Sequence, residues 1–190
     1  DDSSIESGGV GATAYSDAAA VYLGLGVSKS ADYWSSVCTW RSDPKNLGIG
    51  HVFSKQSIPM TWDFAEGNPF SSSSGNYLVS LDWIARVIDQ FNSTRSGIAL
   101  QADASRQTHT IGKVVSTDPP YYDNIGYADL SDFFYVWLRR TIRPIFTELF
   151  STLAVPKSEE LVATPNRHGS RAKAETFFLE GMTNAMHRLA

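Results

Sequence analysis

The sequence is poor in cysteine and has no long hydrophobic run. Cys38 is the only cysteine in 190 residues, which excludes an internal disulfide framework and a zinc site built from several cysteines. No apolar segment approaches the roughly 20 residues that a membrane span needs, and the N-terminus lacks the basic region and apolar core of a signal peptide. The four histidines are widely separated, so no metal site is predicted. We therefore expect a soluble, cytoplasmic protein that does not enter a membrane.

The charges are unevenly divided along the chain. The net charge of −4 argues against a protein that coats nucleic acid without specificity. Residues 1–138 hold 8 basic and 15 acidic side chains, whereas residues 139–190 hold 8 basic and 5 acidic ones. A polyanion would therefore meet the C-terminal part of the chain, unless these cations only form the solvated faces of amphipathic helices. Both interpretations stay open.

Length and patterning predict one α/β domain. Residues 1–11 are rich in serine, glycine and acidic residues and are expected to be disordered or frayed. Residues 12–190 are expected to form a single domain, because a chain of this length can bury one core of ordinary size. Within this domain we expect a helical part over 12–40, an irregular part over 42–75 and an αβ core over 76–143.

Local patterns predict helices and two strands in the second half of the chain. Apolar residues at helical spacing predict helices over 76–92, 129–140 and 172–189. Two short apolar runs, 97–102 and 113–117, are expected to be neighbouring strands of a parallel sheet. The order helix, strand, strand, helix is typical of αβ proteins that gather functional groups at the carboxyl ends of their strands.

Two local features of the first half allow more than one interpretation. Leu23-Gly24-Leu25-Gly26 is not a dinucleotide fingerprint, because no strand precedes it and the third glycine is missing; close packing between helices is the favoured reason for these glycines. The aromatic-rich segment 60–65 either covers a pocket or packs into the core. Core packing is favoured, because aromatic side chains bury large areas.

The second predicted strand stops at an Asp-Pro-Pro-Tyr sequence, residues 118–121. Proline cannot donate to a sheet ladder, so the doubled proline ends the strand and holds the next residues in a turn. Asp103 follows the other predicted strand, and we expect Asp103 and Asp118 to lie on the same rim of the sheet. The alternative is a structural turn in which Asp118 only caps backbone amides.

The Asp-Pro-Pro-Tyr sequence resembles the motif of the amino-methyltransferases that modify exocyclic amines of adenine or cytosine with S-adenosylmethionine. The resemblance implies that the Asp118 carboxylate and the Pro119 carbonyl accept hydrogen bonds from the target NH₂ group, while Tyr121 stacks on a base that has left the duplex. The implied catalytic residues are Asp118, Pro119, Pro120 and Tyr121, and the implied substrate-binding residues are Tyr122 and Asn124.

A wider resemblance covers residues 60–189. Trp62-Asp63-Phe64-Ala65-Glu66, Ser73-Ser74-Gly75-Asn76, Gln101-Ala102-Asp103-Ala104, residues 118–125 and residues 129–134 are similar to a family of large adenine-specific DNA methylases that contain a zinc ribbon. This resemblance implies part of a Rossmann-like, S-adenosylmethionine-dependent methyltransferase sheet with flanking helices. It also implies that Asp103 binds the cofactor near its adenine end. A cap or a surface charge is an equally good interpretation of Asp103.

The resemblance implies DNA as partner and N6-adenine methylation as function. The alternatives are N4-cytosine methylation of DNA, or a non-catalytic nucleic-acid-binding or scaffold fragment. The chain lacks the glycine-rich Phe-x-Gly-x-Gly loop that this class uses for its cofactor, and it does not begin with methionine. We therefore expect a fragment whose main S-adenosylmethionine loop lies in the remainder of a parent polypeptide.

Overall fold

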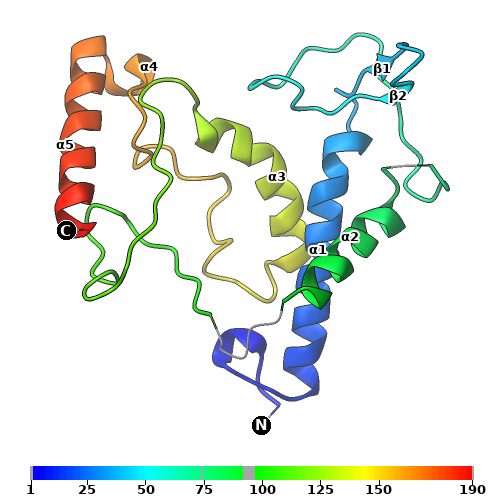
Figure 1. The fold of residues 1–190 in the computed structure, drawn as a ribbon, viewed down its shortest axis with the longest axis horizontal. Helices are drawn as coiled ribbons and strands as arrows, with labels where there is room; N and C mark the ends of the chain where they lie inside the picture. Colours follow the sequence, from blue (N-terminus) through cyan, green and yellow to red (C-terminus); the bar gives the residue numbers. More distant parts are fainter. Residues whose placement is uncertain (1, 74, 92–96, 190) are drawn as a thin grey trace. The chain divides into compact units, whose positions relative to one another are not determined.

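The computed structural model describes residues 2–73, 75–91 and 97–189 (Figure 1). The chain divides into two compact units. Unit 1 consists of Asp1–Asn92 and Asp129–Val155, and unit 2 of Ser93–Ala128 and Pro156–Ala190. In chain order the elements are η1 (Ile5–Ser7), α1 (Ala12–Trp34), β1 (Trp40–Arg41), β2 (Gly48–Ile49), α2 (Tyr77–Asp89), α3 (Tyr127–Ile142), α4 (Pro165–His168) and α5 (Arg171–Leu189).

Helix packing holds unit 1 together. Helices α1 and α2 lie side by side (Figure 1). A Cβ at Gly26 would lie 2.7 Å from Leu81 Cδ2 of α2, and a Cβ at Gly24 would lie 2.8 Å from Ile142 Cγ2 of α3. The close-packing interpretation of these two glycines is therefore confirmed. Next to this contact the buried Ser30 hydroxyl lies 3.0 Å from the hydroxyl of Ser80, so the helix interface includes a satisfied polar pair.

The predicted helices are confirmed, with shifts at their ends. The prediction over 76–92 becomes α2, which begins where the Asn76 side chain accepts a hydrogen bond from the Val79 amide at 2.8 Å; its predicted end at Asn92 lies outside the described residues. The prediction over 129–140 becomes α3, and that over 172–189 becomes α5. The first helix ends at Trp34, before the predicted boundary at residue 40.

The predicted α/β class is wrong. The described part of the chain is mostly helical, and its sheet consists of β1 and β2 alone, paired antiparallel with Trp40 opposite Ile49. Residues 97–102 and 113–117 form no strand. An apolar run becomes a strand only where a neighbour completes its backbone hydrogen bonds. Neither run has such a neighbour among the described residues, and Ile98 and Val114 are exposed to solvent. The Rossmann-like sheet is therefore absent from this part of the chain.

Unit 2 is built around α5. The Ser170 hydroxyl accepts a hydrogen bond from the Lys173 amide at 3.2 Å at the beginning of this helix. Ala174 and Ala185 of α5 are buried, as are Val162 and Ala163 in the segment that precedes α4. A Cβ at Gly181 would overlap the side chain of Leu161, so this glycine lets the segment lie directly against the helix. The core of unit 2 is thus small residues packed closely together.

Candidate functional site

The Asp-Pro-Pro-Tyr sequence forms an exposed turn in unit 2. The Tyr121 hydroxyl donates a hydrogen bond to Asp118 Oδ1 at 2.9 Å, and the Asn124 amide donates to the Tyr121 carbonyl at 3.1 Å. Asp118, Pro119 and Asn124 are exposed, and Pro120 is half-buried. The Tyr121 side chain bends back over Asp118 and remains 54% exposed. Its hydrogen bond to the carboxylate raises the pKa of the Tyr121 hydroxyl.

Tyr122 points to α5 and is held from three sides. Its hydroxyl donates to Glu175 Oε1 at 3.0 Å, its ring meets Phe178 edge-on at 5.2 Å, and its carbonyl accepts from the Ala163 amide at 2.9 Å. Its φ of 56° lies in the left-handed region, which is uncommon for an aromatic residue. These contacts keep Tyr122 in a conformation that it would not favour alone.

Arg171 completes a small charged network behind Tyr122. Its Nε donates to Glu175 Oε1 at 3.0 Å. Hydrogen bonds from Arg171 and then from Tyr122 lower the pKa of Glu175, and the bond to this carboxylate raises the pKa of Tyr122. Glu175 is therefore a carboxylate at neutral pH, and one of its oxygens accepts from both partners.

A buried ion pair supports the chain beyond the turn. Glu160 and Arg167 lie 2.5 Å apart, with side chains only 13% and 18% exposed. The other Glu160 oxygen accepts a hydrogen bond from the Ala128 amide at 2.8 Å, at the beginning of α3. Residues 160–163 thus hold the chain that follows the turn at two points, Ala128 through Glu160 and Tyr122 through Ala163.

Asp103 lies at a turn of its own. Its Oδ1 accepts hydrogen bonds from the Ser105 hydroxyl at 2.7 Å and the Ser105 amide at 2.8 Å, which together lower its pKa. Arg106 lies 3.5 Å from its other oxygen. The sheet rim that was expected to bring Asp103 and Asp118 together is not formed. The interpretation of Asp103 as a cap agrees with these contacts.

The surroundings of Asp103 lack the elements that the resemblance implies for an S-adenosylmethionine site. Asp103 Oδ1 accepts both hydrogen bonds from Ser105, and Oδ2 has only the 3.5 Å contact with the exposed Arg106. No strand end or glycine-rich loop lies beside Asp103 in the described ranges. Within the same ranges, no cluster of His, Cys, Asp and Glu could hold a metal ion, and no helix is long and apolar enough to cross a membrane.

Known proteins give no match. Comparisons with models of protein families, with curated proteins and with solved structures all ended without a match to this chain. The family resemblance of the sequence therefore stays a prediction, and function has to be inferred from the residues themselves.

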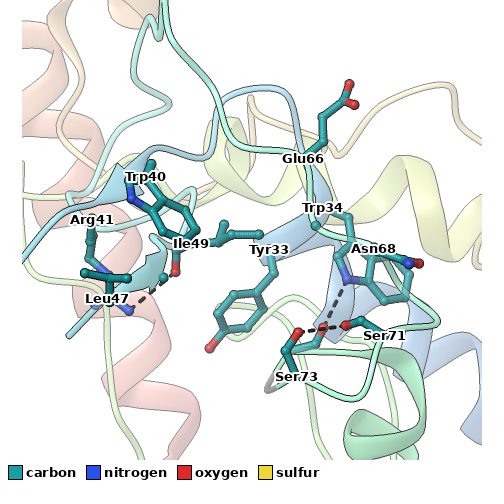
Figure 2. A pocket seen from close by; sticks show the side chains of 13 residues that line it. Tyr33, Trp34, Trp40, Arg41, Leu47, Ile49, Glu66, Asn68, Ser71 and Ser73 are labelled. Carbon is teal, nitrogen blue, oxygen red and sulfur yellow. Dashed lines mark hydrogen bonds between the residues drawn. The ribbon is translucent and has the colours of Figure 1, made fainter.

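Sequence reasoning missed a cavity of about 450 Å³ in unit 1. Figure 2 shows its walls, which include Tyr33 and Trp34 at the end of α1 and Trp40 and Ile49 of the small sheet. The favoured core packing of segment 60–65 is wrong at Trp62, which is 87% exposed. The aromatic residues that line the cavity precede segment 60–65 in the sequence. The cluster of aromatic residues between positions 33 and 40, followed by an irregular segment, is the signal that could have indicated it.

Proposed function

We propose that this chain carries the target-amine half of a DNA amino-methyltransferase and that its target is N6 of adenine. The observation that carries the proposal is the exposed turn at residues 118–121. Asp118 Oδ2 and the Pro119 carbonyl accept no hydrogen bond from any residue that the structure describes, and the Tyr121 ring beside them is more than half exposed. Two free acceptors next to an aromatic face suit an amino group on a flat base.

The chemistry explains why these residue types occur together. An exocyclic amine is a poor nucleophile, because its lone pair is delocalised into the ring. Two acceptors that bind its two N–H groups favour a tetrahedral nitrogen and turn the lone pair away from the ring plane. Asp118 supplies a charged acceptor, and Pro119 supplies a carbonyl whose position the following proline restrains. The Tyr121 ring would stack on the base after it leaves the duplex.

The proposal requires S-adenosylmethionine as the methyl donor, held by the remainder of a parent polypeptide. This chain has no Phe-x-Gly-x-Gly loop, and Oδ1 of Asp103 is bound within its own turn. The proposed setting is the cytoplasm, where a lone thiol such as Cys38 stays reduced.

The test is methyl transfer to DNA by the complete polypeptide. Asp118→Ala should reduce transfer of isotope-labelled methyl groups by at least about 100-fold, the effect of removing one preorganised polar group from a reacting centre. Asp123→Ala is the matched control, because Asp123 is an exposed carboxylate of the same turn region. A loss of transfer supports the proposal when circular dichroism shows an intact fold, and unchanged transfer with Asp118→Ala would refute it.

Two alternatives give different results in the same assay. Methylation of N4 of cytosine uses the same acceptors, and mass spectrometry of the digested nucleosides distinguishes N4-methylcytosine from N6-methyladenine. The lack of a strand end or glycine-rich loop beside Asp103 in the described residues favours a second alternative, a nucleic-acid-binding module without catalysis. That alternative predicts DNA binding by the complete polypeptide and no methyl transfer.

A further inference from the structure

The cavity of unit 1 has aromatic walls that are already oriented. Its volume of about 450 Å³ lies in the range of roughly 300–1,000 Å³ that small-molecule sites occupy. Tyr33 and Trp34 at the end of α1 and Trp40 of β1 contribute three aromatic rings to its lining (Figure 2). Aromatic rings around a cavity of this size are suited to a flat ligand.

Tyr33 is held by a relay of two side chains outside the cavity. The Asp32 carboxylate lies 2.6 Å from His51 Nδ1, and His51 Nε2 lies 3.1 Å from the Tyr33 hydroxyl. With Nδ1 donating to Asp32, Nε2 accepts the Tyr33 proton. The two rings also contact each other, with centroids 4.4 Å apart. The Tyr33 ring is therefore fixed before any ligand arrives, which lowers the entropy cost of binding.

Trp34 is fixed as well, whereas Trp40 is open. The Trp34 indole Nε1 donates to the Gly75 carbonyl at 3.0 Å, and its ring lies against Tyr77 with centroids 6.1 Å apart. Trp40 makes no ring contact with any described residue and is 57% exposed. No described ring of unit 1 stacks on the Trp40 indole, so its exposed face is open to a ligand.

Charged and polar groups surround this aromatic space. Asn68 Oδ1 accepts from the Phe70 amide at 3.0 Å, which leaves the side-chain NH₂ able to donate. Arg41 Nη2 makes one long bond of 3.4 Å to the Ile49 carbonyl and keeps its other donors. Glu66 is exposed at the rim. A ligand among the rings would meet N–H donors and one cation, whereas the Glu66 carboxylate extends away from them (Figure 2).

We propose that this cavity binds a purine base that carries a phosphate. The base would lie against Trp40 and Tyr33, its ring nitrogens would accept from the Asn68 amide, and the phosphate would bind the Arg41 guanidinium. The same chemistry is presented by a free purine nucleotide and by a base of single-stranded nucleic acid. The proposal concerns binding by unit 1 and does not depend on methyl transfer.

The positions of the charges favour a nucleotide over an aromatic amino acid. In Figure 2 the Arg41 side chain lies beside Trp40, whereas the Glu66 side chain extends away from Arg41 and from the rings. The amine and the carboxylate of an amino acid share one carbon atom, so they cannot reach both groups. A nucleotide carries its phosphate at one end and polar base edges at the other, which matches this separation.

The test is calorimetric titration of the whole chain with four probes: adenosine monophosphate, adenosine, a short single-stranded oligodeoxyadenylate and L-tryptophan. Trp40→Ala should weaken binding of adenosine monophosphate by at least about tenfold, the loss expected for one base stacked on an aromatic ring. Arg41→Ala should weaken binding of adenosine monophosphate and leave adenosine unaffected. Trp83→Ala is the matched control, because Trp83 is an exposed tryptophan of α2 outside the cavity.

Each outcome decides the proposal. Binding of adenosine monophosphate that depends on Trp40 supports a free nucleotide, and binding of the oligonucleotide alone with the same dependence supports a base in a strand. The proposal is overturned if neither adenosine monophosphate nor the oligodeoxyadenylate binds. Preference for L-tryptophan overturns it as well, as does an equal effect of Trp83→Ala. If circular dichroism shows that Trp40→Ala does not fold, the Arg41→Ala variant decides: its affinity for adenosine monophosphate should fall while its affinity for adenosine stays the same, and an unchanged affinity for adenosine monophosphate overturns the proposal.

Discussion

The Glu160–Arg167 pair provides the sharpest test of how unit 2 holds the candidate turn. Removing one partner of a buried ion pair costs about 3–5 kcal/mol, whereas an exposed pair contributes less than about 1 kcal/mol. With side chains 13% and 18% exposed, this pair lies near the buried limit. Glu160→Gln keeps an acceptor for the Ala128 amide but leaves Arg167 without its carboxylate. We expect the free energy of unfolding of unit 2 to fall by about 2–3 kcal/mol.

Hydrogen exchange is the suitable assay, because all five tryptophans belong to unit 1 and their fluorescence does not report on unit 2. A loss of about 2 kcal/mol corresponds to roughly 30-fold faster exchange for amides that open with unit 2. The amides to follow are those of α5 around its buried residues Ala174 and Ala185. Tryptophan fluorescence then serves as the control that unit 1 remains folded.

A double-mutant cycle separates the ion pair from general damage. Arg167→Met keeps the aliphatic stem and removes the charge, so the variant with both substitutions has no buried cation that has lost the Glu160 carboxylate. We expect it to regain about 1–2 kcal/mol relative to Glu160→Gln alone. The reasoning is refuted if Glu160→Gln exchanges within about twofold of the original chain, or if the double variant is no more stable than Glu160→Gln.

Three further predictions follow from local geometry. Gly24→Ala should lower the free energy of unfolding of unit 1 by about 1 kcal/mol in urea titration followed by tryptophan fluorescence, because overpacking against Ile142 at 2.8 Å outweighs the gain in helix propensity; a more stable variant contradicts this. Asp118→Asn should lower the pKa of Tyr121, measured by tyrosinate absorbance, since it removes the carboxylate that raises it; an unchanged pKa contradicts the hydrogen bond. Cys38, which has no exposed surface and a raised thiol pKa, should react with thiol reagents only in denaturant.

The helices could be predicted from the sequence because their signals are local. The apolar spacing of residues 129–140 and the proline at position 144 place α3 within a few residues of its observed ends. The strands could not, because a strand depends on a partner that can be far away in sequence. The runs 97–102 and 113–117 have strand composition, yet they have no neighbouring strand in the described part of the chain.

The site was predictable only in its local part. Asp118 and Tyr121 are three residues apart, and their hydrogen bond lies within one turn. The contact of Tyr122 with Glu175 joins residues 53 apart, and nothing in either segment indicates the other. The cavity of unit 1 is equally non-local, because its walls come from a helix end, a two-stranded sheet and the irregular segment after it.

The difference between Asp103 and Asp118 bears directly on the proposed function. The expected role of Asp103 depends on a sheet rim, and without the sheet its carboxylate binds its own turn through Ser105. Asp118 depends on two prolines and one hydrogen bond to Tyr121, all within four residues, so the orientation of its carboxylate does not require a strand before it. Under the proposed function, the turn that is to bind the amine is present in this chain, whereas the sheet that is to position the cofactor is not formed in its described part. A longer polypeptide that supplies strand partners to residues 97–102 and 113–117 should release Asp103 from Ser105, and its failure to do so would leave Asp103 as a cap only.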